Sequence, residues 1–183
     1  MRQIIIGQVL LIICCIFYLV WWYLGFRPNT TVNRMGGING ILLLLTAIFG
    51  VSGISFSLLP TPETVNTQYR QLLIVVAGIG AYIPLMFITK TMFNRIVTSE
   101  LFLIVGWTML ELSLLNRLGG SGLLSGSGLV AVYIVIAIAF VISMILYVAY
   151  YRMEEMQAFY AAMVPLVTEG LSMGVLVWML LRI

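Results

Sequence analysis

Six long apolar runs, separated by short polar segments, make up almost the whole chain. The runs cover residues 4–25, 35–59, 72–93, 98–116, 127–149 and 158–181. An α-helix needs about 20 mostly apolar residues to cross the hydrocarbon core of a bilayer, and each run is close to that length. Because helices satisfy their own backbone hydrogen bonds in lipid, the pattern predicts an all-α integral membrane protein. We expect six transmembrane helices with short loops in a single domain over residues 1–183.

Proline marks some of the loops and also interrupts two of the runs. Arg27 and Pro28 follow the first run, whose length and lack of a small-residue cleavage motif predict a retained membrane helix rather than a cleaved signal. Pro84 lies within the third run and Pro165 within the sixth. Proline has no backbone N–H and clashes with the preceding turn, so we expect kinks in both helices.

The composition indicates that lipid is the solvent of this protein. Hydrophobic residues make up 62% of the chain and charged residues only 8%, whereas soluble domains have about 25% charged residues. The net charge of +3 comes from nine Lys and Arg residues without a basic patch, so a nucleic-acid-binding protein is excluded. The chain has no His and no Asp, so it lacks His-based metal sites and aspartyl dyads, and we expect neither a metal nor another cofactor.

The charged residues do not fix the orientation in the membrane. Six spans place both termini on one side, where four basic residues would lie: Arg2, Arg70, Arg117 and Arg182. Five would lie on the other side: Arg27, Arg34, Lys90, Arg95 and Arg152. Such a balance fits weak orientation signals or dual topology with antiparallel dimers. We expect a multi-pass protein of the cell membrane, either plasma or inner. Its interfacial aromatic belt on the non-terminal side would comprise Trp21, Trp22, Tyr23, Tyr147, Tyr150, Tyr151, Phe159 and Tyr160.

Glu169 is the first candidate for a functional residue, because it lies near the centre of the sixth run. A charged side chain at the bilayer centre costs at least ~2.5–3.5 kcal/mol, and intramembrane acids mark solute and proton pathways. Pro165 and Ser172 share its helical face, and Pro165 leaves the carbonyl of Ala161 without its helical donor. The structural alternative is a neutral carboxylic acid that hydrogen-bonds a neighbouring helix.

Trp107 and Glu111 form a second candidate face on the fourth run. An acid and an indole at this spacing would line a vestibule of the same pathway. The alternative is a local contact of Glu111 with Asn116 or Arg117 near the end of the helix.

Small residues in the second and sixth runs predict close helix packing, either within the bundle or between subunits. Asn39 stands among them and needs a hydrogen-bond partner if it is buried. Pro84 frees a carbonyl group that a neighbour or a ligand must satisfy. Both residues therefore join the candidate pathway. The packing glycines are Gly36, Gly40, Gly50 and Gly53 in the second run and Gly170 and Gly174 in the sixth.

These features predict a polytopic transporter or channel for a small solute, proton-linked through Glu169. In length and number of spans the chain resembles the substrate-binding subunits of energy-coupling-factor vitamin transporters. The alternative function is a substrate-binding, assembly or regulatory subunit of a larger membrane complex. A lipid-modifying enzyme that uses Glu111 and Glu169 has the least support, because the sequence has no nucleophile motif. The expected partners are the bilayer, a small solute, and either further copies of the chain or other membrane subunits.

Overall fold

The structure, a computed structural model, describes residues 2–27, 36–58, 68–93, 99–120, 122 and 124–182. Every regular element in these ranges is a helix: α1 (Arg2–Phe26), α2 (Gly36–Leu58), α3 (Gln68–Phe93), α4 (Ser99–Gly120), α5 (Gly126–Tyr150), α6 (Glu155–Ala161) and α7 (Val164–Leu180). Five stretches are long and apolar enough to cross a membrane: α1, residues 37–57, residues 72–92, α5, and α6 with α7. The all-α prediction is therefore confirmed within the described residues. α4 occupies the place of the fourth predicted run.

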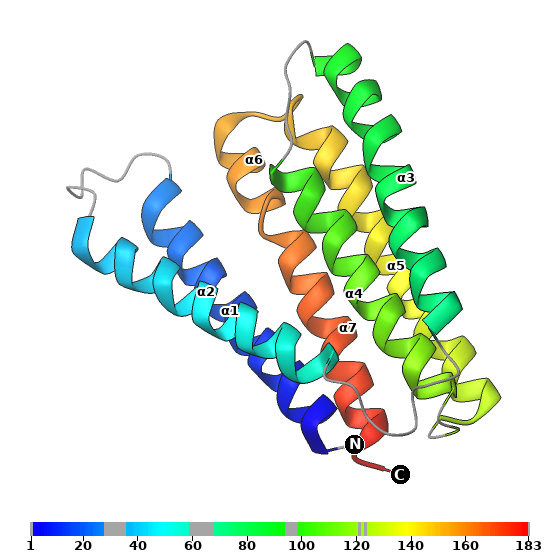
Figure 1. Cartoon of the computed structure of the whole chain (residues 1–183). Coiled ribbons are helices and arrows are strands. Elements are labelled where there is room, and N and C mark those ends of the chain that lie inside the picture. The colour runs from blue at the N-terminus through cyan, green and yellow to red at the C-terminus, as the bar shows by residue number, and fades with distance from the viewer. Residues whose placement is uncertain are drawn as a thin grey trace.

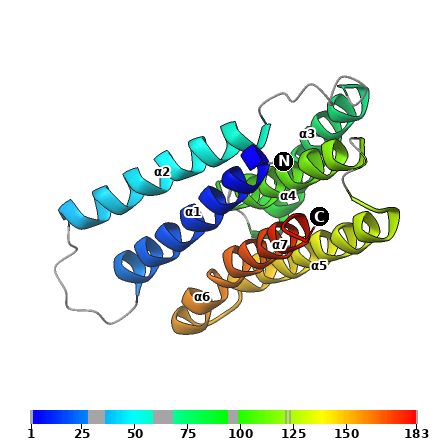
Figure 2. The same ribbon diagram turned by 90° about the horizontal axis from the view of Figure 1, so that it is seen from below.

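The helices pack as a chain of neighbours. α2 lies along α1, α1 packs on α7, α7 on α5, α5 on α4, and α4 on α3. Figure 2, seen from below, shows α1 and α2 as a pair set apart from the group of α3, α4, α5 and α7. Both ends of the chain lie at the same end of the bundle, and α6 lies at the opposite end (Figure 1). We call these the terminal end and the α6 end.

A cluster of buried aliphatic side chains closes the terminal end. This leucine core joins α1, α4, α5 and α7 and consists of Ile4, Leu114, Leu115, Leu118, Leu124, Val132, Ile136, Leu176 and Leu180. Leu114, Leu115 and Leu118 are fully buried. From this cluster the α1–α2 pair and the other helices diverge toward the α6 end (Figure 1). The bundle is thus tightly packed at one end and more open at the other.

The outer faces of α2 and α3 are apolar and exposed. Val51 on α2 is 66% exposed and Leu72 on α3 is 60% exposed, and many of their neighbours on these faces are also exposed hydrophobic residues. A soluble protein rarely exposes apolar area on this scale. These two helices therefore present the surface expected of a protein surrounded by lipid.

The two mid-span prolines have different outcomes. α3 runs without interruption through Pro84. The sixth predicted run, however, is two helices, because the chain leaves the helix at Ala162 and Met163 and α7 begins with Pro165 in its first turn. The prediction of one kinked helix over 158–181 is corrected to a broken one. Ala162 and Met163 keep right-handed backbone angles, with φ of −66° and −80°, so the break is local.

Glycine packing is concentrated at the crossing of α1 and α2. A Cβ atom added at Gly53 would lie 2.7 Å from Cγ of Leu11 and 3.0 Å from the carbonyl oxygen of Gly7. A Cβ atom at Gly50 would lie 3.2 Å from Sγ of Cys14. These two predicted packing glycines therefore allow the backbones of α1 and α2 to approach closely.

Three other predicted packing glycines have open space around them. A Cβ atom added at Gly40, Gly170 or Gly174 would meet no atom within 4 Å. Gly36 begins α2, and its surroundings lie outside what the structure describes. Within the described residues, close packing therefore uses Gly50 and Gly53 and not Gly40, Gly170 or Gly174.

Candidate functional site

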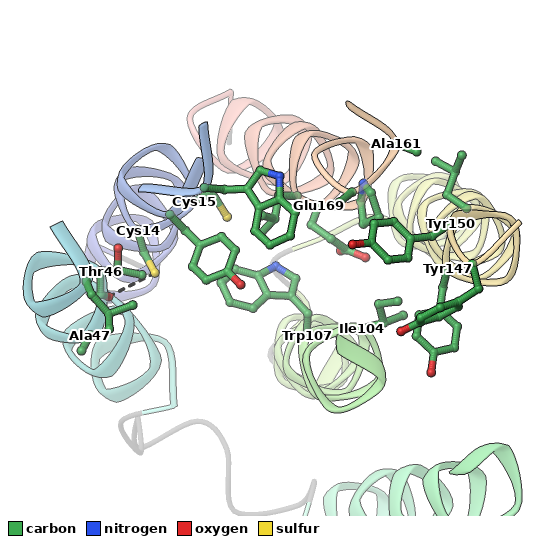
Figure 3. A pocket seen from close by; sticks show the side chains of 18 residues that line it. Cys14, Cys15, Thr46, Ala47, Ile104, Trp107, Tyr147, Tyr150, Ala161 and Glu169 are labelled. Atoms are coloured by element: carbon green, nitrogen blue, oxygen red, sulfur yellow. Dashed lines mark hydrogen bonds between the residues drawn. The ribbon is translucent and has the colours of Figure 1, made fainter. Parts of the chain in front are cut away.

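A pocket of about 310 Å³ lies between the α1–α2 pair and the helices α4 to α7. Its lining residues lie in the half of each helix nearer the α6 end, and the pocket is partly open. Figure 3 shows Cys14 and Cys15 on one side and Tyr147 and Tyr150 on the other. Small-molecule sites measure about 300–1,000 Å³ and are mostly apolar with a few polar groups. The pocket fits that description.

Glu169 supplies the acidic group of the pocket. It lies on α7 one turn after Pro165, and its side chain is only 5% exposed. The carboxyl group points toward the middle of the pocket (Figure 3). Neither Oε1 nor Oε2 has a hydrogen-bond partner among the described residues. A buried carboxyl group without a partner lowers folding stability, so it is the feature of this site that most needs an explanation.

Ser172 connects the two buried glutamates. Its Oγ lies 2.5 Å from Oε1 of Glu111 on α4 and 2.8 Å from the carbonyl oxygen of Glu169. The hydroxyl group has a single hydrogen, which the Glu111 side chain and the backbone carbonyl share as acceptors. The arrangement therefore ties the side chain of Glu111 to α7. It also replaces the predicted contact of Glu111 with Asn116 or Arg117.

Trp107 and the two cysteines add polar atoms to the walls. Trp107 Nε1 is buried without a hydrogen-bond partner in the described part of the chain, and Figure 3 shows the indole facing the pocket. The thiol of Cys14 donates to the carbonyl oxygen of Thr46 at 3.2 Å. Cys15 is buried beside it. Neither cysteine was among the predicted site residues.

Aromatic side chains form the wall toward the α6 end. Trp22 on α1 donates from Nε1 to the carbonyl oxygen of Phe159 on α6 at 3.3 Å, and the two rings are stacked. Trp22, Tyr147 and Tyr150 all line the pocket, so part of the predicted interfacial belt also forms this site. The spacing of Tyr18 and Trp22, four residues apart on one helical face, is a signal that could have indicated a shared role.

Two predicted pathway residues lie elsewhere. Pro84 is on the exposed face of α3, a helix that packs on α4 and does not line the pocket. Asn39 lies opposite Gly25 at the α1–α2 contact, and its Oδ1 atom is buried without a partner among the described residues. The structure thus brings Glu169, Pro165 and Trp107 to one pocket, with Ser172 and Glu111 directly behind Glu169.

No protein-family model matches the chain, and no curated protein and no solved structure matches it either. The function of the site therefore has to be argued from its own residues.

Proposed function

We propose that the protein is a multi-pass membrane carrier that binds a small solute in this pocket and exchanges a proton at Glu169. The observation that carries the proposal is the buried, unpartnered carboxyl group of Glu169, directed into a pocket of ligand size. Such a group is costly unless a ligand or a proton compensates it. A merely structural acid would instead be hydrogen-bonded to a neighbouring helix.

The exposed apolar surface supports a location in a membrane. Five stretches are long and apolar enough to span the bilayer, and α4 would be a sixth span, because it lies between α3 and α5 and has a similar length of 22 residues. The outward hydrophobic residues of α2 and α3 would contact lipid. We place the protein in the plasma or inner membrane, with both termini on one side.

The shape of the bundle favours a carrier over a channel. The pocket lies in the half of the bundle nearer the α6 end, while the leucine core fills the space between α1, α4, α5 and α7 at the terminal end. A carrier exposes its site to one side of the membrane at a time. The structure would then represent a state that is closed at the terminal end.

The contact between Glu111 and Ser172 supports the proton link. Glu111 on α4 accepts a hydrogen bond from Ser172, which lies one turn after Glu169 on α7, so the two buried carboxyl groups lie on contacting helices. Charges of the same sign in such a setting repel each other, so the pair favours retention of a proton. Binding of a solute at Glu169 would then release that proton into the pocket.

Proton-flux measurements in liposomes test the proposal. The purified protein is reconstituted with a pH-sensitive dye inside, and a panel of amines, amino acids and sugars is added outside. We expect one solute class to drive proton flux in the wild-type protein, and Glu169→Gln to abolish it. Glu155→Gln is the matched control, since Glu155 is exposed on α6. Equal solute-driven flux in the wild-type protein and Glu169→Gln would contradict the proposal.

A subunit of a larger membrane complex is the second candidate function. Gly40, Gly170 and Gly174 have open space where a side chain would extend, so another helix could approach these faces closely. Native mass spectrometry of gently solubilised protein separates the two functions. Copies of this chain alone would fit a carrier, whereas co-purified subunits would fit the complex. A lipid-modifying enzyme is supported only by the proximity of the two glutamates, and lipid turnover by purified protein would be its test.

A further inference from the structure

We infer that the solute is an organic monocation with an apolar or aromatic body. This inference deepens the proposed function, because it rests on the pocket being the solute site. It is based on the charge of the pocket, on its aromatic walls and on the small number of polar atoms within reach. Each of these observations restricts the chemistry of the solute.

The charge of the pocket favours a positive ligand. Among the described residues that line it, Glu169 is the only one with a formally charged side chain, and none is Lys or Arg. An ionised carboxylate in an apolar pocket is stable only when a cation compensates it. An anionic solute would be repelled, and a neutral solute would not displace the proton from Glu169. A single carboxylate matches a single positive charge.

The walls indicate that the cation is organic. Ca²⁺ takes about six to eight oxygen ligands, and Mg²⁺ also prefers a shell of oxygen ligands, whereas Glu169 is the only carboxylate among the described residues that line this pocket. The aromatic residues Trp22, Trp107, Tyr147 and Tyr150 line the same pocket. Figure 3 labels the last three. Rings of this kind attract ammonium groups through cation–π interactions and also bury apolar carbon.

The unpaired indole N–H of Trp107 adds one further feature. It is buried without a partner in the described part of the chain, and it is a donor only. A hydroxyl, ether or carbonyl oxygen on the solute would satisfy it beside the ammonium group. The complete ligand would therefore be a compact amine with an apolar body and one acceptor atom.

Direct binding of model compounds tests the charge preference. The probe is benzyltrimethylammonium, whose charge is fixed, and the matched compound is neopentylbenzene, in which a carbon atom replaces the nitrogen. Phenylacetate is the anionic comparison. Binding to the full chain in lipid nanodiscs is followed by tryptophan fluorescence, because Trp22 and Trp107 line the pocket. We expect the cation to bind at least about tenfold more tightly than the neutral compound.

Variants show whether the preference comes from Glu169. Glu169→Gln is expected to lose the preference for the cation, and Glu169→Asp is expected to retain part of it. Glu155→Gln is expected to bind like the wild-type protein. Circular dichroism and thermal unfolding of each variant show that it is folded, so a loss of binding in a folded Glu169→Gln protein reports on the charge.

The outcomes distinguish a failure of the cation inference from a failure of the carrier proposal. Equal affinity for the neutral compound, unchanged cation binding in Glu169→Gln, or no binding of the cation to folded protein would overturn the inference. A carrier for another solute class would still show solute-driven proton flux in that case. If the cation binds through Glu169 but is not moved across liposomes, the inference holds and the carrier proposal fails.

Discussion

Ser172 forms the contact between the two helices that carry the buried glutamates. Its hydroxyl lies within hydrogen-bond distance of Glu111 on α4 and of the backbone of Glu169 on its own helix, α7. Both carboxyl groups are almost completely buried. Because both oxygens of the Glu169 carboxyl group are without a partner among the described residues, the serine links Glu111 to the backbone of α7 and not to that carboxyl group.

Replacing Ser172 with Ala tests this bridge. The change leaves Oε1 of Glu111 buried without a partner, so we expect the free energy of unfolding to fall by about 1–3 kcal/mol. Unfolding in mixed detergent micelles measures the change. Ser55→Ala is the control, because Ser55 is exposed on α2, and it should have little effect. A similar loss in both variants would show that the hydrogen bond is unimportant.

Binding of benzyltrimethylammonium should become tighter as the pH rises. Protons and the cation compete for the Glu169 carboxyl group, and the charge of the probe does not change with pH. The titratable groups that share the pocket with Glu169 or neighbour it are Glu111 from α4, Cys14, Cys15 and Tyr18 from α1, Tyr147 and Tyr150 from α5, and Tyr151 just after α5. Titration with the probe over an acidic to mildly alkaline range measures the effect. Affinity that does not change with pH would indicate that Glu169 is not the competing group.

The site residues could be predicted only in part from the sequence. Glu169, Glu111 and Trp107 are recognisable because acidic or indole groups within apolar runs are unusual, and Ser172 shares a helical face with Glu169. The bridge from Ser172 to Glu111 depends on the packing of α7 against α4, which local spacing does not encode. Pro84 was predicted as a pathway residue because a proline within a helix leaves a carbonyl group free, but it lies on the exposed face of α3.

At the scale of elements, the crossing of α1 and α2 depends on Gly53. In Gly53→Ala the new methyl group would lie 3.0 Å from the carbonyl oxygen of Gly7, and a backbone atom cannot rotate away. We expect Gly53→Ala to lower the free energy of unfolding by about 1–3 kcal/mol. Gly40→Ala is the matched control on the same helix. Open space surrounds Gly40, so its substitution should be neutral or stabilise by up to about 1 kcal/mol.

Unfolding of the two glycine variants in detergent, followed by circular dichroism, measures the difference. Equal stability of Gly53→Ala and Gly40→Ala would show that the close approach of α1 and α2 is not tight. The reverse order would indicate that the face around Gly40 is covered by a second copy or another subunit.

The positions of the helix ends could be predicted better than whether a helix continues without a break. Long apolar runs place most helices to within a few residues, because length and hydropathy are properties of the local sequence. The break between α6 and α7 was missed, since the apolar pattern continues through Ala162 and Met163. Pro165 gave the correct position, but a proline alone does not distinguish a bend from an end, as the uninterrupted α3 shows.

At the scale of the whole molecule, the sequence does not indicate which helices pack against each other. α1 contacts α7, so the first and the last helices together form part of the pocket wall, although they are far apart in the chain. Both termini lie at one end of the bundle (Figure 1), as an even number of long runs in the sequence predicts. The divergence of the α1–α2 pair from the other helices, which creates the pocket, follows only from tertiary packing.

Thiol labelling tests the asymmetry of the bundle. In a Cys14→Ser, Cys15→Ser background, a cysteine is introduced by Ala162→Cys at the pocket wall or by Leu114→Cys in the leucine core. We expect a membrane-impermeant maleimide to label the first variant in liposomes and not the second, because Leu114 is fully buried and Ala162 lines the partly open pocket. Labelling of both positions at similar rates would argue against a sealed terminal end.

The leucine core also has an electrical consequence. In a protein that spans the bilayer as proposed, the membrane potential falls mainly across the part that excludes water, which is the leucine core and not the pocket. Moving one elementary charge through the whole potential corresponds to about 2.3 kcal/mol per 100 mV. A cation that reaches Glu169 from the α6 end crosses little of this voltage. Binding should therefore depend weakly on the membrane potential. The conformational step should also depend on it weakly, because Glu169 carries either a proton or the cation and the loaded site has no net charge.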